Sequence, residues 1–269
     1  EQEDKTAIVL GATSGDTGSA AIDACRSYAR IKSFIMLPNG NMSEVQRRQM
    51  STIAADNVFA LRINGTFDDC QDLVKQAFIQ RDFLQSGQYL LAVNSINWTR
   101  IVGQICYYFY AYNQLAAHQT LNFSIPTGNF GNVLAGYFAM KMGLPVDQFM
   151  VASNSNDILT RFLINKDMSI NGVVETHSPS MDIQISSNFE RLAFESANRD
   201  AEKINEAMVE FRKTGKMPLP DGMWEKINKK FQGMSINNDK TLKAIKKWKE
   251  EKGIIFDPHS AIGLSLIHI

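Results

Sequence analysis

The stretch Pro126-Thr127-Gly128-Asn129-Phe130-Gly131-Asn132 lies between an apolar run at residues 123–125 and a helical pattern at residues 133–142. A loop in this position brings several backbone N–H groups to a helix N-terminus, where the helix dipole adds partial positive charge. Its two glycines carry no Cβ, so the backbone can close on a ligand, and its two asparagines add side-chain donors. The pattern predicts a phosphate-binding turn from a strand to a helix. The alternative is a turn of the same kind that binds nothing.

A second loop of the same design lies near the start of the chain, at Ala12-Thr13-Ser14-Gly15-Asp16-Thr17-Gly18. It follows a strand-like run at residues 6–10 and precedes a helical pattern at 19–30. Hydroxyl groups, a carboxylate and glycines on one turn suit a second anionic group, such as a substrate carboxylate. The first of the two loops along the chain lacks G-x-G-x-x-G, and neither has the Lys-Ser/Thr pair of a P-loop, which argues against NAD and ATP.

Strand-like runs alternate with helical patterns up to about residue 164. The predicted strands are 6–10, 33–37, 58–63, 89–93, 121–125 and 149–152, and the predicted helices are 19–30, 43–53, 67–84, 97–117, 133–142 and 156–164. This alternation predicts an α/β fold with an open, mostly parallel sheet and flanking helices, followed by a helical C-terminal segment. Ligands of such sheets bind beyond the carboxyl ends of the strands, where both loops fall.

The sequence also predicts the structure of three other segments. Residues 97–117 are rich in aromatic side chains, and a helix that is apolar on most sides is usually buried, so we expect core packing there. Residues 172–188 show little periodicity and are expected to form a long ordered loop, a kind of loop that is usually functional. Residues 189–252 read as helical, with breaks at 217–220 and 232–238.

The charge balance, the cysteines and the lengths of the apolar runs argue against several classes of protein. Lys plus Arg and Asp plus Glu are equal at 28 each, so no global field favours nucleic acid or an anionic membrane as partner. The three cysteines are far apart, which indicates neither a disulfide framework nor a metal site. No apolar run reaches the roughly 18 residues of a membrane span. A cytoplasmic protein with a small-molecule ligand fits these features.

The two loops together resemble those of threonine synthases, which use pyridoxal phosphate (PLP) to convert O-phosphohomoserine to threonine. The similarity runs from about residue 4 to residue 263, and several further motifs occur in the same order. They are Asn64-Gly65-Thr66-Phe67-Asp68-Asp69-Cys70-Gln71, Asn94-Ser95-Ile96-Asn97-Trp98 with Arg100, Ser178-Pro179-Ser180-Met181-Asp182-Ile183-Gln184, Ser187-Asn188-Phe189-Glu190-Arg191 and Asp257-Pro258-His259. The resemblance implies a fold-type II PLP enzyme, a carbon–oxygen lyase acting on phosphates.

The resemblance also implies roles for individual residues. The PLP phosphate would be held by Gly128, Asn129, Phe130, Gly131 and Asn132. The substrate carboxylate would be bound by Ser14, Gly15 and Thr17, with Asp16 facing the cofactor ring. Asn97 and Arg100 are candidates for the substrate's phosphate, because an arginine can hold a phosphate through two parallel hydrogen bonds. For Arg100 the alternative is a structural pair with a carboxylate.

The chain departs from the family at both ends. In threonine synthases the lysine that binds PLP covalently lies upstream of the ATSGDTG loop in an F-K-D context, which Lys5 lacks. We therefore expect this catalytic lysine upstream of Glu1, and an internal fragment that is inactive alone. Residues 1–170 would form the α/β region that binds PLP and substrate, and 171–263 a loop plus a helical segment. Residues 264–269 match nothing in the family and are expected to be a non-native tail.

Two other functions stay open at this point. A related phospho-lyase would release a 2-keto acid and ammonia without adding water, and both loops would look the same. A non-catalytic phosphate-binding fragment is the other alternative. The sequence leaves monomer and dimer equally open.

Overall fold

The structure is a computed structural model that describes residues 5–13, 15–39, 44–65, 67–94, 97–115 and 119–267. The chain forms two compact units, Glu1–Asn97 (unit 1) and Trp98–Ile269 (unit 2). The predicted division into a binding region (1–170), a loop-plus-helix region (171–263) and a tail (264–269) stays a prediction.

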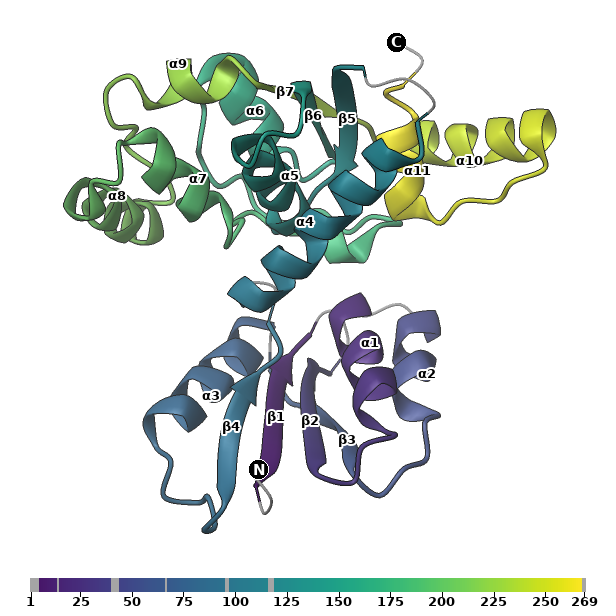
Figure 1. The fold of residues 1–269 in the computed structure, drawn as a ribbon, viewed down its shortest axis with the longest axis vertical. Coiled ribbons are helices and arrows are strands. Elements are labelled where there is room, and N and C mark those ends of the chain that lie inside the picture. The colour runs from purple at the N-terminus through teal and green to yellow at the C-terminus, as the bar shows by residue number, and fades with distance from the viewer. Residues whose placement is uncertain are drawn as a thin grey trace. The chain divides into compact units, whose positions relative to one another are not determined.

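Unit 1 is a parallel four-stranded sheet in the order β3-β2-β1-β4, with helices on both faces. Its elements are β1 Thr6–Ala12, α1 Asp16–Cys25, β2 Ile31–Pro38, α2 Glu44–Ser51, β3 Val58–Ile63, α3 Phe67–Ile79 and β4 Gln88–Ala92. Alternate residues of β1 point to opposite faces: Val9 packs in the cluster that contains Ile22 of α1, and Ile8 in the cluster that contains Val74 of α3. Figure 1 shows α1 and α2 on one side of this sheet and α3 on the other.

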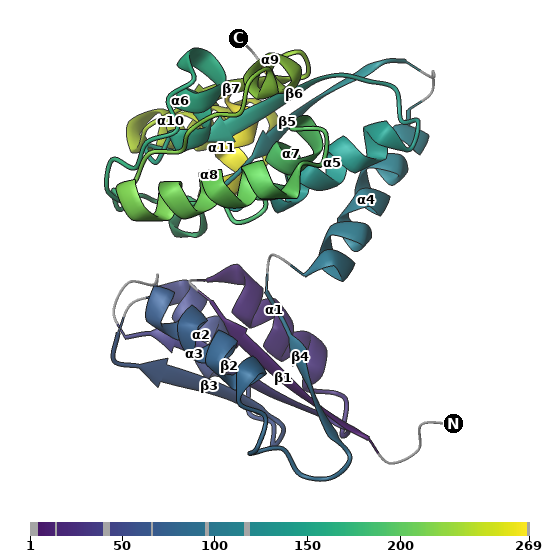
Figure 2. The ribbon, with the colours of Figure 1, turned by 90° about the vertical axis from the view of Figure 1, so that its left-hand side faces the viewer.

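Unit 2 contains a second parallel sheet, in the order β5-β6-β7. Its elements are α4 Trp98–Asn113, β5 Leu121–Pro126, α5 Gly131–Lys141, β6 Val146–Ser153, α6 Ile158–Asn165, a 3₁₀ helix Pro179–Met181, α7 Phe189–Ser196, α8 Ala201–Thr214, α9 Met223–Asn228, β7 Phe231–Ser235, α10 Asn238–Lys252 and α11 Pro258–Leu264. Figure 1 shows α8 and α10 at opposite ends of this unit, and in Figure 2, where the left-hand side of Figure 1 faces the viewer, α8 lies in front.

The central strand β6 carries the core of unit 2. Phe149 and Val151 are fully buried, and they join one hydrophobic cluster with Val133 and Leu134 of α5. Burial of this kind contributes about 1.5–3 kcal/mol for each large side chain. The start of α5 is therefore fixed on a rigid base. The loop of residues 126–132, which ends there, is called the phosphate loop below, after the ligand predicted for it.

The predicted fold class, α/β with parallel strands and flanking helices, is confirmed, but the strands form two sheets and include one that we did not predict. β7 occupies most of a segment that reads as a break in a helical region. The sequence is misleading there because of Gly233, whose added Cβ would lie 2.8 Å from Cα of Thr160. The glycine permits α6 to lie close against the strand, which is a recognised use of glycine in strands.

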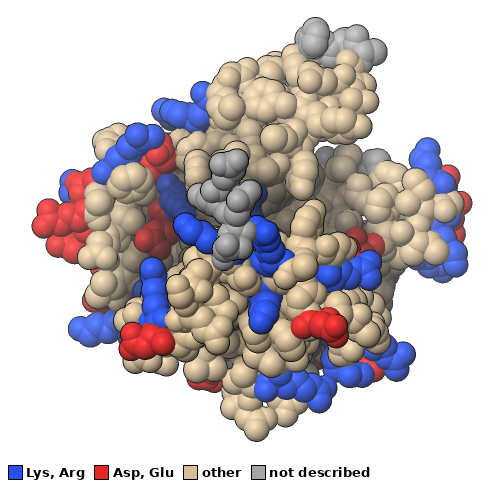
Figure 3. Space-filling model, turned by 60° about the horizontal axis from the view of Figure 1, so that its bottom comes forward, with Lys and Arg blue, Asp and Glu red and all other residues tan. Residues whose placement is uncertain are grey.

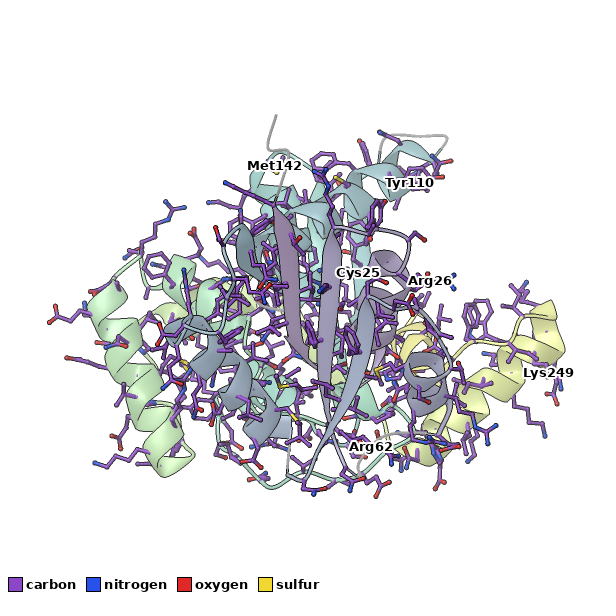
Figure 4. The ribbon with its side chains drawn as sticks, turned by 90° about the horizontal axis from the view of Figure 1, so that it is seen from below. Cys25, Arg26, Arg62, Tyr110, Met142 and Lys249 are labelled. Carbon is purple, nitrogen blue, oxygen red and sulfur yellow. The ribbon has the colours of Figure 1, made fainter. Side chains whose placement is uncertain are left out.

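The expectation that the aromatic helix is buried is correct for only one face of α4. Ile101, Ile105 and Tyr108 are buried, whereas Tyr107 and Tyr110 are 65% and 68% exposed. Tyr110 is labelled in Figure 4, where it lies on the outer side of the helix. The helix is thus amphipathic in spite of its aromatic composition.

Surface chemistry agrees with the balanced composition. Basic and acidic side chains are both spread over the face drawn in Figure 3. Within the described ranges, no helix has the length and apolar character needed to cross a membrane. At the C-terminal end, Leu266 is 7% exposed and packs in a cluster with Met181 and Ile262. The status of 264–269 as a non-native tail stays a prediction.

Candidate active site

The phosphate loop begins where β5 ends and is anchored at its first turn by Thr127. The backbone N–H of Thr127 donates to the carbonyl of Ala152 in β6 (2.8 Å), and its Oγ1 donates to the carbonyl of Ile125 (2.9 Å). Thr127 is 6% exposed. These bonds fix the entry of the chain into the loop at the carboxyl end of the sheet.

Phe130 turns the loop into α5 in a left-handed conformation, with φ 62° and ψ 8°. A non-glycine residue in this region costs roughly 1–2 kcal/mol. The side chain is 2% exposed, and its ring meets that of Phe189 edge to face, with centroids 5.6 Å apart. Packing thus holds a strained residue at a place where a left-handed residue makes successive N–H groups converge on an anion.

The backbone N–H groups that follow Thr127 in the loop differ from that of Thr127, because they have no acceptor among the described residues. In the part of the chain that the structure describes, the N–H groups of residues 128–132 donate to no backbone or side-chain oxygen, and α5 has no side-chain cap. Gly128 is required for close packing, because a Cβ there would lie 2.9 Å from the carbonyl oxygen of Ser180. A set of unsatisfied donors at a helix N-terminus fits a phosphate group such as that of PLP. The assignment of Gly128, Asn129, Phe130, Gly131 and Asn132 to the cofactor stays a prediction.

The carbonyl side of the same loop is hydrogen-bonded to three consecutive residues. Ser186 Oγ donates to the carbonyl of Gly128. Ser187 Oγ donates to Asn129 Oδ1 (3.2 Å), and both the backbone N–H and Nδ2 of Asn188 donate to the carbonyl of Asn129 (3.2 and 3.1 Å).

The last residue of the loop, Asn132, is held from α4. Tyr108 Oη lies 2.9 Å from the carbonyl oxygen of Asn132 and 2.7 Å from its Oδ1, and Asn132 Nδ2 donates to Gln104 Oε1 (3.2 Å). Burial raises the pKa of the Tyr108 hydroxyl above its usual value, so it remains a neutral donor. The buried face of α4 thereby orients the first turn of α5.

Residues 172–188 form the expected ordered loop, and Asp182 organises it. Its carboxylate accepts hydrogen bonds from Asn154 Nδ2 (2.7 Å), Asn156 Nδ2 (2.9 Å), and the N–H (2.8 Å) and Oγ1 (2.6 Å) of Thr176. Four donors on one partly buried carboxylate make a strong local network. The network ties this loop to the end of β6.

The D-P-H motif supports the same region from α11. Asp257 caps this helix by accepting from the N–H groups of His259 (2.9 Å) and Ser260 (3.2 Å). His259 Nε2 accepts from the N–H of Ser180 (3.3 Å), the residue whose carbonyl lies against Gly128. The motif therefore buttresses the phosphate loop.

The loop of unit 1 is organised by Thr13, which is buried at 3% exposure. Its Oγ1 accepts from the N–H groups of Gly15 and Gly18, each at 3.0 Å, and so satisfies two backbone donors of the turn. Asp16 Oδ1 accepts from Gln46 Nε2 (2.8 Å). Ser14 lies outside the described residues. The site roles predicted for Ser14, Gly15, Asp16 and Thr17 stay predictions.

Asn97 and Arg100 belong to different units. Asn97 Nδ2 donates to the carbonyl of Ala92 at the end of β4 (2.9 Å). Arg100 lies in the first turn of α4, where burial lowers the pKa of its guanidinium and the hydroxyl of Tyr107 acts in the opposite direction. Their joint role toward a substrate phosphate stays a prediction.

Several residues that shape these loops were not assigned a role from the sequence. They are Thr13, Gln46, Gln104, Tyr108, Ser186, Ser187 and Asn188. Two of these places carried a signal in the sequence: Thr13 lies in the loop at residues 12–18, and Ser187 and Asn188 lie in the motif at residues 187–191, which had no assigned function.

Comparison with known proteins gives three findings. Residues 1–268 match the family model described as "Pyridoxal-phosphate dependent enzyme". The chain is 47% identical over 258 residues to the threonine synthase of Pseudomonas aeruginosa (96% of this chain, 55% of that protein), and 34% identical over 267 residues to "Threonine synthase-like 2" of Xenopus laevis (98% and 56%). The crystal structure of PLP-bound threonine synthase from Brucella melitensis superposes with a TM-score of 0.88 at 44% identity, covering 99% of this chain and 57% of that one. The chain thus spans about half the length of these relatives.

Proposed function

Because the chain belongs to the family of pyridoxal-phosphate dependent enzymes, we propose that it is part of a threonine synthase, which converts O-phospho-L-homoserine and water to L-threonine and phosphate. The similarity to threonine synthases from several organisms supports this activity. The structural observation that carries the proposal is the row of N–H groups at residues 128–132, which have no acceptor within the described part of the chain.

PLP, when bound, supplies an electron sink for the reaction. The residues of unit 2 bind its phosphate: Gly128, Asn129, Phe130, Gly131 and Asn132 direct backbone donors at it, and the dipole of α5 adds positive potential. No cationic side chain is needed for this step. The fixed loop also positions the cofactor, which is the protein's main contribution in such enzymes.

The loop of unit 1 binds the substrate's carboxylate through Ser14, Gly15 and Thr17. Asp16, whose Oδ1 accepts from Gln46 Nε2, is the residue of this loop that we assign to the cofactor ring. Arg100 and Asn97 bind the substrate's own phosphate, and the partial burial of the Arg100 guanidinium strengthens such a pair, because a less hydrated cation loses less water on binding.

The same proposal covers the wider setting of the protein. Its partner is the small-molecule substrate, with no nucleic acid and no membrane, in the cytoplasm, as a monomer or a dimer. The covalent lysine lies outside residues 1–269, so these residues alone are inactive.

The phosphate role is tested with Asn129→Ala and with Asn205→Ala as control, since Asn205 is exposed on α8. Loss of a charge-assisted hydrogen bond of about 1.5–3 kcal/mol should weaken PLP binding roughly tenfold or more. Pyridoxal, which lacks the phosphate, should bind both variants equally. Equal PLP affinities for the two variants would contradict the assignment.

A second activity stays open beside the synthase, that of a threonine-synthase-like phospho-lyase. A phospho-lyase of this kind would release phosphate, a 2-keto acid and ammonia. Incubation of the complete natural protein with O-phosphohomoserine separates the two activities: threonine equal to the phosphate released supports the synthase, and ammonia equal to the phosphate supports the lyase.

A further inference from the structure

Three consecutive residues, Ser186, Ser187 and Asn188, hold the carbonyl side of the phosphate loop, and we name them the carbonyl clamp. Their bonds to Gly128 and Asn129 join segments 58–59 residues apart in the sequence. Ser186 is 4% exposed and Asn188 is fully buried, so water does not compete for these bonds. The clamp acts on the face of the loop that is turned away from the N–H groups.

The geometry of the peptide bond connects the two faces. In a trans peptide the C=O of one residue points opposite to the N–H of the next, and the group is planar. All peptide bonds of the described residues are trans. Fixing the carbonyl of Gly128 therefore aims the N–H of Asn129, and fixing the carbonyl of Asn129 aims the N–H of Phe130.

The clamp also orients one side chain. Ser187 Oγ donates to Asn129 Oδ1, which determines which end of this amide faces the clamp. Its Nδ2 has no acceptor in the described part of the chain. One hydroxyl thus turns the donor end of the side chain away from the clamp.

We propose that Ser186, Ser187 and Asn188 are positioning residues for the PLP phosphate: they never touch the cofactor, and they aim the donors of Asn129 and Phe130 at it. The inference rests on the proposed function. The structural evidence for the clamp does not depend on that function, because the direction of each N–H follows from the hydrogen bond on the preceding carbonyl. The clamp is itself held on both sides, by the Asp182 network before it and by Phe189, which packs on Phe130, after it.

The test compares Ser186→Ala and Ser187→Ala with Ser124→Ala in the complete natural protein that carries this chain. Ser124 is the matched control, because its hydroxyl also donates to a backbone carbonyl in unit 2, that of Gly263 (2.6 Å), outside the phosphate loop. Dissociation constants for PLP and for pyridoxal are measured for each variant. We expect PLP binding to weaken about tenfold in both clamp variants, pyridoxal binding to change less than twofold, and the control to match the wild type.

The rate of amide hydrogen exchange at Asn129 and Phe130 gives a second measurement, which does not depend on enzyme activity. In the wild type PLP should slow this exchange, and in Ser186→Ala the slowing should be reduced. If Ser186→Ala fails to fold, Ser187→Ala decides, because Ser187 is only half-buried.

Three outcomes overturn the inference. Unchanged PLP affinity in both folded clamp variants refutes the clamp alone and leaves the proposed function standing. An equal loss for PLP and pyridoxal means that the clamp has a general structural role. A wild type that binds PLP no better than pyridoxal removes the proposed function, and the inference with it.

Discussion

Replacing Tyr108 with phenylalanine removes one oxygen atom and leaves the buried ring of α4 in place. That oxygen donates toward the carbonyl and the Oδ1 of Asn132, at 2.9 and 2.7 Å, and the residue is 4% exposed. A net hydrogen bond contributes about 0.5–1.5 kcal/mol, and an acceptor left unsatisfied costs about 1–3 kcal/mol. In the variant the carbonyl of Asn132 keeps its place in the first turn of α5, and the Asn132 side chain is only half-buried. The penalty for unsatisfied acceptors is therefore limited, and we expect the unfolding free energy of unit 2 to fall by roughly 1–2 kcal/mol.

The control is Tyr110→Phe, two residues along the same helix, where the hydroxyl is in solvent. Thermal unfolding should show a melting temperature lower by roughly 2–8 °C for Tyr108→Phe and unchanged for Tyr110→Phe. Cofactor affinity should fall in the first variant, because Asn132 lies in the first turn of α5, next to the backbone donors that we assign to the phosphate.

The pH dependence gives an independent check. Burial raises the pKa of Tyr108 in the folded chain above its usual value of 10.0. Above about pH 10 the unfolded chain loses this proton while the folded chain keeps it, so the unfolding free energy falls by about 1.4 kcal/mol per pH unit. Tyr108→Phe should lack this component and Tyr110→Phe should retain it. Identical stability, pH slope and cofactor affinity in the two variants would refute the reasoning.

Three further predictions concern other residues. Asp182→Asn should lower the unfolding free energy in urea by roughly 2–4 kcal/mol and open residues 172–188 to proteases, because the new amide cannot accept from all four donors. Asp221→Asn, at an exposed residue, is the control, and equal stability of the two variants would contradict this prediction. Arg100→Ala should raise the KM for O-phosphohomoserine about tenfold and leave the absorbance of bound PLP unchanged; a changed spectrum with unchanged KM would assign Arg100 to the cofactor instead. Borohydride treatment of the 269-residue chain with one equivalent of PLP should label no single lysine above the low level shared by the exposed lysines in peptide mass spectra. One lysine labelled selectively and almost completely would place the covalent residue inside the chain.

The strands were predictable where burial leaves a local pattern. The run at residues 6–10 reads as a buried strand, and β1 extends it by two residues. β7 was not predictable, because Gly233 serves a contact with Thr160 that no nearby residue reveals. The two loops were found from glycines and asparagines at strand ends. The aromatic composition of α4 predicted a helix buried on most sides, but its aromatic residues lie on both its buried and its exposed face.

The residues that shape the site were the hardest to find. Ser186 contacts Gly128 across 58 positions, and Asp182 contacts Asn154 across 28. Hydrogen bonds between irregular segments impose no periodicity on the sequence, so serine and asparagine in such segments read as ordinary loop residues. The family resemblance marked the Ser187–Arg191 motif without giving its physical role, which required the geometry of the carbonyls.

The left-handed conformation of Phe130 has a kinetic consequence. A flexible loop would lose about 1–2 kcal/mol of conformational entropy per residue at each binding event. Here the edge-to-face contact with Phe189 already holds Phe130 in its left-handed conformation when the protein folds. The backbone of residues 126–132 should therefore move by less than about 1 Å between the free and the loaded protein. Association then needs no rearrangement of the loop, and substitutions around Phe130 should change the residence time of the cofactor far more than its rate of capture.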